Sequence, residues 1–283
     1  MEKGLKVYIH TDLEGVSGVV EWDPQNSLAS DIEKYFKKLK MSELLTGEVN
    51  AAVRAAKDAG ATTIYVSDNH GPARNILIDQ LDPTAELIHG INSLQPSWVP
   101  CLDESFDAVV AVGMHAMAGT KYASLPHSMW HINNDEIRLS EASMCAALAG
   151  YFDVPFVFIS GDQQITKELC EKIPNIETAV VKEALSPFFA RCLHPVKAQQ
   201  LIYEGVKRGI ENRKAIKPYK IKGGYRINVS DRDPNIMILD EDVTGDDLFE
   251  TVHKALNKMP WNDFGSQDLD NKVIRYHLAR QKK

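Results

Sequence analysis

The chain has 283 residues, of which 44% are hydrophobic and 25% charged, as expected for a globular protein with a full core. Its formal net charge of −7 argues against general binding to nucleic acid or to anionic membranes, which requires a basic face. No stretch approaches the roughly 18 uncharged apolar residues of a membrane span, and the first residues have no signal-peptide architecture. The four scattered cysteines contain no CxxC motif and are expected to be reduced, mostly buried thiols, so we predict a cytoplasmic protein.

The first part of the chain alternates predicted strands with a predicted helix. Residues 5–12 alternate apolar and polar side chains, as a strand does. Residues 42–60 carry apolar side chains at helical spacing and stop at a glycine. Residues 62–71 combine a β-branched strand with a polar turn. Residues 106–116 are almost continuously apolar, which is typical of a strand buried on both faces of a parallel sheet.

The central part continues this alternation. Residues 127–142 are predicted to form a hairpin with Asn134 and Asp135 in the turn, and residues 140–152 a helix with Ser140 as its N-cap. A buried strand over 154–162 and a helix over 163–173 follow. Strands and helices that alternate in this way predict an α/β fold, a mostly parallel sheet flanked by helices on both faces.

The pattern changes in the C-terminal part. We expect a strand over 178–184, a long amphipathic helix over 195–213, a hairpin or strand pair over 219–231, and a helix over 244–259. The last residues, 270–283, are basic and favour a short helix or a frayed tail.

These elements predict one domain over residues 1–265. It comprises a half over 1–165, which carries the candidate ligands described next, and a C-terminal α+β subdomain over 166–265. A basic tail follows at 266–283.

Residues that suit a metal ion follow three of the predicted strands. Asp12 and Glu14 come after the first strand, His70 after the second, and His115 after the third. Because the carboxyl ends of parallel strands meet at one edge of a sheet, we expect these side chains to lie close together. Glu141 is in the first turn of a predicted helix, where the helix dipole favours an ionised carboxylate.

Each of these residues has an ordinary explanation by itself, such as a turn cap, a solvated acid or a buried histidine. Together they form a mixed histidine and carboxylate set, which suits Zn²⁺ or a similar divalent ion. Five ligands exceed what one tetrahedral zinc needs. Two ions about 3.5–4 Å apart, bridged by one carboxylate, are the natural geometry for such a set.

The two acids of the stretch HTDLEGVSG are one residue apart. Since side chains i and i+2 of a strand point the same way, Asp12 and Glu14 can face the same metal cluster while Leu13 enters the core. Gly15 then lets the chain turn away without a Cβ in the way. Asp68 is either a residue that orients a metal-binding histidine or a turn acid that bonds to its own backbone.

Several well-known motifs are absent: the chain has no GxGxxG after the first strand, no GxxxxGK[ST], no HExxH and no GxSxG. The same ligands could also serve another metal-dependent amidase, an L-peptide hydrolase, a phosphoesterase or a non-catalytic metal-binding protein. A phosphoesterase is disfavoured because the sequence shows no Arg/Lys cluster near the ligands to hold a phosphate.

Five segments occur in the order and spacing of the M55 family of zinc D-aminopeptidases: TDLEGVSG, SDNHG, GMHA, LPHSM and LSEASMCAALAGYFDVP. The chain therefore resembles this family from about Lys6 to about Asp162, and more weakly through IPNIETAVVKEALS and CLHPVKAQQLI. The family pattern SxDxEG is changed here, where His10 and Thr11 precede Asp12; a change from Ser to Thr keeps the hydroxyl. The unmatched C-terminal region is expected to shape the pocket or the oligomer.

The resemblance implies two zinc ions per subunit, held by Asp12, Glu14, His70, His115 and Glu141, with Asp12 bridging the two ions. It implies that His127 is the catalytic histidine, and that the protein removes the N-terminal residue of short peptides containing D-amino acids. A metal-activated water would attack the scissile carbonyl, while His127 stabilises the oxyanion or protonates the leaving amine. The resemblance also implies a homodecamer of two stacked pentameric rings.

Overall fold

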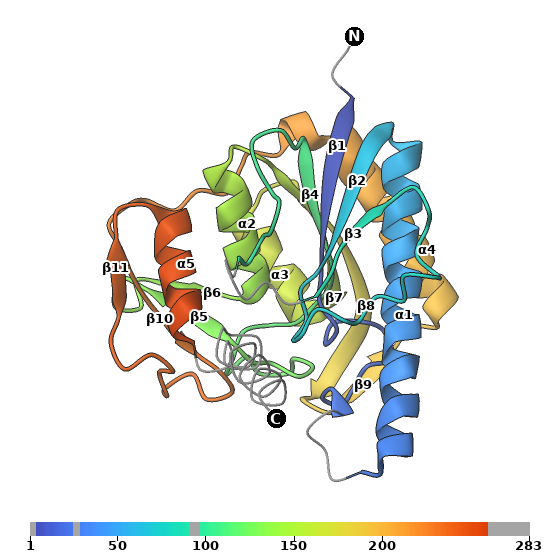
Figure 1. Ribbon diagram of the computed structural model, residues 1–283, viewed down its shortest axis with the longest axis horizontal. Coiled ribbons are helices and arrows are strands. Elements are labelled where there is room, and N and C mark those ends of the chain that lie inside the picture. Colours follow the sequence, from blue (N-terminus) through green and yellow to red (C-terminus); the bar gives the residue numbers. More distant parts are fainter. Residues whose placement is uncertain (1–3, 25–28, 91–96, 260–283) are drawn as a thin grey trace, which may run out of the picture.

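Two β-sheets organise the chain (Figure 1). The computed structural model describes residues 4–24, 29–90 and 97–259. The basic tail predicted at 266–283 lies outside the described residues. No helix among the described residues is long and apolar enough to cross a membrane.

The larger sheet has seven strands in the order β3-β2-β1-β4-β7-β8-β9, and six of them are parallel. Only β9 runs antiparallel, beside β8. The mostly parallel sheet predicted from the sequence is therefore confirmed. The strand bounds are β1 Leu5–Thr11, β2 Ala61–Asp68, β3 Glu86–Ile88, β4 Ala108–Met114, β7 Phe156–Asp162, β8 Glu177–Ser186 and β9 Phe189–Cys192.

Helices cover both faces of this sheet, as predicted (Figure 1). On one face lie α1 and α4, which pack against each other, and on the other lie α2 and α3. Their bounds are α1 Asp31–Asp58, α2 Glu141–Tyr151, α3 Gln163–Lys172 and α4 Pro195–Glu211; a short 3₁₀ turn, Arg213–Ala215, follows α4.

Helix α1 begins well before the predicted start at residue 42. Ser30 caps it: the hydroxyl of Ser30 accepts a hydrogen bond from the backbone N–H of Glu33, and the Glu33 carboxylate accepts one from the backbone N–H of Ser30. This reciprocal pair is a capping box, a start signal that can be found in sequence. The prediction missed it because the apolar periodicity begins a turn or more later.

The smaller sheet is antiparallel, with the order β11-β10-β5-β6, and α5 packs against it (Figure 1). Asn134 and Asp135 have positive φ in the β5–β6 turn, which confirms the predicted hairpin. The hairpin predicted over 219–231 is wrong: only β10 forms there, because it pairs with β5 and β11 instead of with its own flank. The bounds are β5 Met129–Ile132, β6 Ile137–Leu139, β10 Tyr225–Ser230, β11 Val243–Gly245 and α5 Leu248–Lys258.

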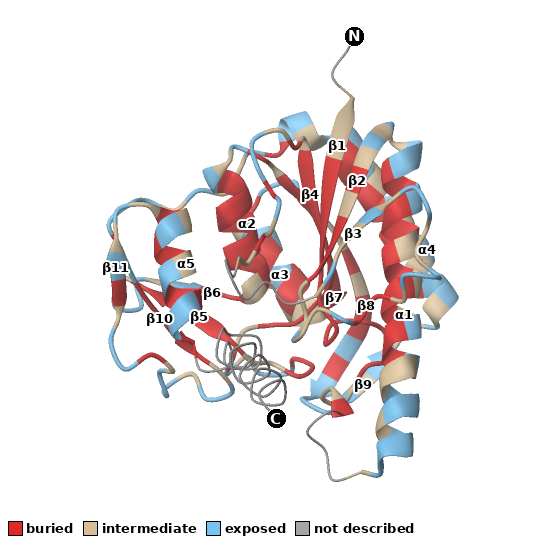
Figure 2. Ribbon diagram, viewed as in Figure 1, coloured by how far each residue is buried: buried red, intermediate tan, exposed pale blue. Residues whose placement is uncertain are grey.

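The core lies between the large sheet and its helices (Figure 2). All residues of β4 and β7 are buried, and so is almost every residue of α2, which is enclosed between the two sheets. The four cysteines are free, but only Cys145 is buried. The expectation of mostly buried thiols is therefore wrong for Cys101 and Cys170, which are exposed loop and helix-surface residues.

A buried acid joins α1 to the chain that leaves β1. One oxygen of Glu48 accepts a hydrogen bond from the backbone N–H of Ser17 at 2.9 Å, while its other oxygen has no hydrogen-bond partner. Burial raises the pKa of Glu48 to about 8, although the Ser17 N–H and the charge of Lys182 oppose the shift. Glu48 therefore keeps its proton at neutral pH in the folded protein.

The buried proton of Glu48 predicts a pH dependence of stability. An acid whose folded pKa is about 8 and whose unfolded pKa is near 4.5 stabilises the fold fully below about pH 4.5, and loses that contribution as pH rises through about 8. Between these two pH values the free energy of unfolding falls by up to about 1.4 kcal/mol per pH unit. Replacing Glu48 with Gln should remove the slope, so the variant gains stability relative to wild type between pH 5 and pH 8. Urea unfolding of both proteins at these two pH values measures this, and an equal difference at both would contradict it.

Candidate metal centre

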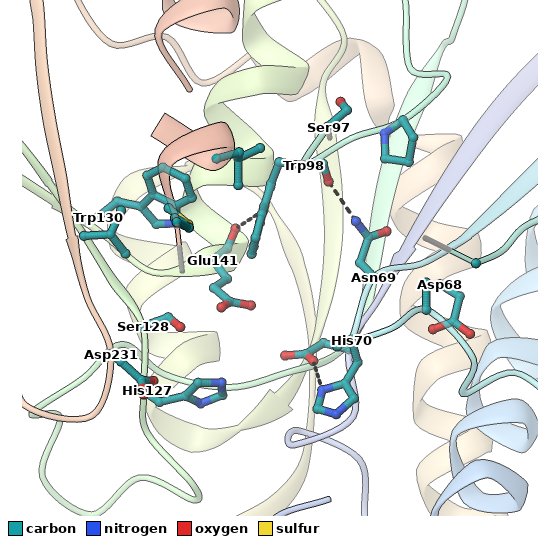
Figure 3. Close-up of a pocket in the computed structure, with 18 residues that line it drawn as sticks. Asp68, Asn69, His70, Ser97, Trp98, His127, Ser128, Trp130, Glu141 and Asp231 are labelled. Carbon is teal, nitrogen blue, oxygen red and sulfur yellow. Dashed lines mark hydrogen bonds and ion pairs between the residues drawn. The ribbon is translucent and has the colours of Figure 1, made fainter. Parts of the chain in front are cut away.

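The candidate ligands predicted from the sequence converge at the carboxyl edge of the large sheet. Figure 3 shows His70, His127 and Glu141 directed toward one another there. Asp12 and Glu14 follow β1, His70 follows β2, His115 follows β4, and Glu141 is the first residue of α2. His127 comes from the loop between β4 and β5. Elements far apart in the sequence thus bring six side chains to one place.

The first group of donors contains Asp12, Glu14 and His70, whose candidate ligand atoms lie within 4.8 Å of one another. Nδ1 of His70 is 3.2 Å from Oδ1 of Asp12 and 2.9 Å from Oε2 of Glu14. Both carboxylates therefore face the same imidazole. The strand alternation expected to orient them is not the cause, because β1 ends at Thr11 and the chain bends and turns at Leu13 and Glu14. Leu13, between them, is buried in the core.

The second group contains His115, His127 and Glu141, again within 4.8 Å. Nε2 of His115 is 3.4 Å from Oε2 of Glu141 and 3.4 Å from Oδ2 of Asp12. The two oxygens of Asp12 therefore face histidines of different groups. The ring of His127 stacks on that of His115, with centroids 3.7 Å apart, so the geometry allows His127 to be either a ligand or a neighbour of the ligands.

Hydrogen bonds fix the orientation of the histidine rings. Nδ1–H of His115 donates to the carbonyl of Ala116 at 2.8 Å, so that in the neutral ring the lone pair is on Nε2, the nitrogen that faces the carboxylates. Nδ1–H of His127 donates to the carbonyl of Leu125 at 3.0 Å and likewise frees Nε2. Such bonds to the second nitrogen are typical of histidines that bind metals.

Two further acids lie near His70. Oδ2 of Asp23 is 3.5 Å from Nε2 of His70 and also pairs with Lys38. Asp68 instead accepts hydrogen bonds from the backbone N–H groups of Asn75 and Ile76. Of the two roles that the sequence allows for Asp68, the structure shows the turn acid. Asp23 is the acid that contacts the far nitrogen of His70, and no motif in the sequence pointed to it.

The turn after Glu14 approaches the end of β4 closely. The backbone N–H of Gly15 donates to the carbonyl of Gly113 at 2.7 Å, and a Cβ at position 15 would lie 2.0 Å from the carbonyl oxygen of Met114. Lys182, fully buried, donates from its ammonium group to the carbonyls of Glu14 and Val19. These contacts hold Glu14 at the site and show why only glycine fits at position 15.

The charges of the site depend on one another. Burial, followed by repulsion from Glu14, raises the pKa of Asp12 to about 7. Burial by itself lowers the pKa of His115, but the Glu141 carboxylate, 3.4 Å from its Nε2, outweighs burial and brings that pKa to about 10. Burial raises the pKa of Glu141, but His115 overcomes it and lowers the value to about 2. The carboxylates of Asp12, Glu14 and Glu141 thus all interact with the positive charge of two histidines, His70 and His115.

The donors fit a divalent cation better than they fit one another. Oδ2 of Asp12, Oε2 of Glu14 and Nε2 of His115 are buried and form no hydrogen bond, so their only polar contacts are the ion pairs within the site. A buried polar atom without a partner costs about 1–3 kcal/mol, and more when it is charged. Zinc prefers this combination of imidazole nitrogens and carboxylate oxygens, so these atoms are suited to ligate it.

A cavity of about 370 Å³ opens beside these ligands (Figure 3). Its wall includes Asp12, His70, His127 and Glu141. Trp98 lies over this cavity: its Nε1–H donates to the backbone carbonyl of Glu141 at 3.2 Å, and its own carbonyl accepts a hydrogen bond from Asn69 at 2.9 Å. Sequence reasoning missed Trp98 because its contacts join two segments far away in the chain.

A second polar cluster has the connectivity of a nucleophilic triad but not its accessibility. The hydroxyl of Ser230 lies 2.9 Å from Nε2 of His131, whose Nδ1 bonds to Asp135. The side chain of Ser230 is fully buried, and neither Ser230 nor His131 lines the cavity. A nucleophile must reach its substrate, so we interpret this cluster as a structural link between β10 and the β5–β6 hairpin.

Comparisons with known proteins point to one family. A model of the Peptidase_M55 family, described as D-aminopeptidase, matches residues 5–237. The chain is 32% identical over 221 residues to a D-aminopeptidase of Bacillus subtilis (strain 168), a match that covers 76% of this chain and 77% of the relative. Its fold matches the solved structure of the Zn-dependent D-aminopeptidase DppA from Bacillus subtilis, a self-compartmentalizing protease, with a TM-score of 0.76 and 27% identity over 89% of this chain and 95% of that one.

The contact at Gly15 generates a prediction about metal binding. Replacing Gly15 with Ala should displace Glu14, because the new Cβ would overlap the Met114 carbonyl, and zinc content per folded chain should fall by half or more. Gly223→Ala is the control, because the nearest atom to a Cβ there lies at an ordinary contact distance of 3.6 Å and the residue precedes β10, away from the ligands. Zinc analysis of folded protein checks both; equal zinc content in the two variants would refute the role of the contact.

Proposed function

This chain belongs to the Peptidase_M55 family of D-aminopeptidases, and we propose that it is a dinuclear zinc aminopeptidase that removes the N-terminal residue of short peptides containing D-amino acids. As a family member it is a metal-dependent peptidase. The observation that carries the proposal is the position of the Asp12 carboxylate. Its two oxygens face His70 on one side and His115 on the other, as a bridging ligand requires.

In this proposal Asp12, Glu14 and His70 would hold one zinc ion, and Asp12, His115 and Glu141 would hold the second. Zinc ions held there supply Lewis acidity toward the scissile carbonyl and lower the pKa of water to about 7. Glu141 adds a further favourable feature, because it is at the N-terminus of α2, where the helix dipole stabilises a carboxylate.

His127 is proposed to hold or move the proton of the reaction. The hydrogen bond from its Nδ1–H to Leu125 directs Nε2 to the cavity beside His115. From there it can stabilise the oxyanion of the tetrahedral intermediate or give a proton to the leaving amine. The ring of Trp22 packs edge-on against the imidazole of His127, with ring centroids 5.1 Å apart, and limits the movement of this imidazole.

The lining of the cavity favours a peptide over a phosphate ester. Among the described residues that line it there is no Lys or Arg, the side chains that usually bind phosphate. An amidase or an L-peptide hydrolase on the same ligands would differ from the proposed enzyme only in its substrate. Assays on matched D- and L-peptides and on simple amides distinguish these activities.

We further propose that the protein is a cytoplasmic homo-oligomer, and a homodecamer as the family resemblance implies. The structural neighbour DppA is a self-compartmentalizing protease, and this chain matches nearly its whole length. Sedimentation of the purified protein tests the number of subunits.

Two substitutions separate metal binding from proton transfer. His115→Ala should lower bound zinc and abolish peptide hydrolysis together, because His115 is a proposed ligand. His127→Ala should lower kcat by about 100-fold or more, as expected for loss of a general acid–base group, with zinc content near wild type. Metal analysis and hydrolysis of a D-Ala dipeptide measure both effects.

Each result has an opposite that would change the assignment. Full activity of His127→Ala would remove its catalytic role, and loss of one zinc ion from that variant would make His127 a ligand instead. One zinc ion per wild-type chain, at saturation, would exclude the dinuclear site.

A further inference from the structure

The cavity beside the candidate ligands has two chemically different parts. The ligands and their polar neighbours form one part, on the edge of the large sheet. The other part is apolar and comes mostly from elements of the small sheet and the helix on it; its walls are Trp98, Trp130, Val229, Leu256 and Met259. Figure 3 shows Trp98 and Trp130 beside Glu141, at one end of the cavity.

The apolar part is buried and firmly held. Trp130, Val229 and Met259 are each no more than 3% exposed. The rings of Trp98 and Trp130 pack edge to face with centroids 5.6 Å apart. Trp98 is also hydrogen-bonded to Glu141 and to Asn69, the neighbour of His70. These walls therefore lie at a fixed position relative to both groups of ligands.

Small residues line another part of the cavity. Gly71 is exposed and Ala73 and Gly90 are half-buried, so among the lining residues that the structure describes no large side chain closes the cavity there. The cavity thus has an apolar end of almost fully buried side chains, the closed end, and a more open end at Gly71, Ala73 and Gly90.

We propose that the closed apolar end binds the side chain of the substrate's N-terminal residue and selects large apolar side chains such as those of Leu and Phe. This inference rests on the proposed aminopeptidase function. An aminopeptidase substrate has no residue before the first one, so its first side chain occupies the closed end, while the rest of the peptide extends through the open end. Burying a Leu or Phe side chain strengthens binding roughly 10- to 100-fold, whereas Ala fills little of such a space.

Part of this wall belongs to the chain's own C-terminal region. Leu256 and Met259 follow the last residue matched by the family model, which ends at residue 237. The fit of the substrate's N-terminal side chain therefore depends partly on residues outside the region 5–237 that the family model matches.

The cavity volume of about 370 Å³ is within the usual range for sites that bind small ligands.

The test uses the full zinc-loaded chain with p-nitroanilides of Ala, Leu and Phe, each as D and L enantiomers. The wild type should show kcat/KM at least about tenfold higher for Leu and Phe than for Ala, in the preferred enantiomer. Met259→Trp, which fills the closed end, should lower the values for Leu and Phe at least tenfold and change that for Ala by less than threefold. Val252→Ala is the control, because Val252 is buried on α5 but does not line the cavity; its selectivity should equal that of wild type.

A binding measurement gives an independent readout without turnover. Alaninol, leucinol and phenylalaninol carry the amino group and side chain but no scissile bond, and tryptophan fluorescence reports their binding. Leucinol and phenylalaninol should bind the wild type at least tenfold more tightly than alaninol, and Met259→Trp should remove this difference.

The outcomes separate the two proposals. Cleavage of Ala as fast as Leu and Phe, or equal effects of Met259→Trp on all substrates, would overturn the inference and leave the aminopeptidase intact. No cleavage of any substrate by the zinc-loaded wild type would overturn the proposed function, and the amino alcohols would then still show whether the apolar end selects side chains.

Discussion

Mutual repulsion among buried carboxylates is the constraint on which the site depends. Asp12 and Glu14 are almost completely buried and face the same histidine, and Glu141 contacts the same nitrogen of His115 as Asp12 does. Acids so placed are unfavourable unless positive charge lies between them. Protons on His70 and His115 supply some of that charge, and a divalent cation bound by these donors would supply more. The fold therefore holds an arrangement that is suited to metal and strained without it.

The fold maintains this arrangement by fixing the backbone near Glu14 and at Glu141. Gly15 lies against the end of β4, Lys182 binds the carbonyl of Glu14, and Glu48 binds the backbone N–H of Ser17. On the other side, α2 is enclosed between the two sheets and carries Glu141 at its N-terminus. Because these supports come from different elements, small changes in the core are expected to be transmitted to the ligands.

The two sheets contribute different kinds of side chain to the cavity. The parallel sheet brings together donors from β1, β2 and β4, as open parallel sheets commonly do at their carboxyl edge. The small antiparallel sheet and α5 contribute Trp130, Val229 and Leu256, which are apolar and have no part in metal binding. In the proposed enzyme, metal binding and selection of the substrate side chain therefore use residues of separate elements, so the apolar residues can change without changing the ligands.

Sequence by itself determined the α/β class and the five candidate ligands, because strand alternation, buried apolar runs and acids or histidines at strand ends are all local patterns. It could not determine which groups those ligands form. The position of Asp12 between His70 and His115, the contact of Asp23 with His70, and the Trp98 bridge to Glu141 each join segments distant in the chain. Sequence also did not show that β10 pairs with the β5–β6 hairpin rather than with residues 219–224. Those features depend on tertiary packing, since local sequence fixes where a side chain emerges from its own element but not which other element lies opposite it.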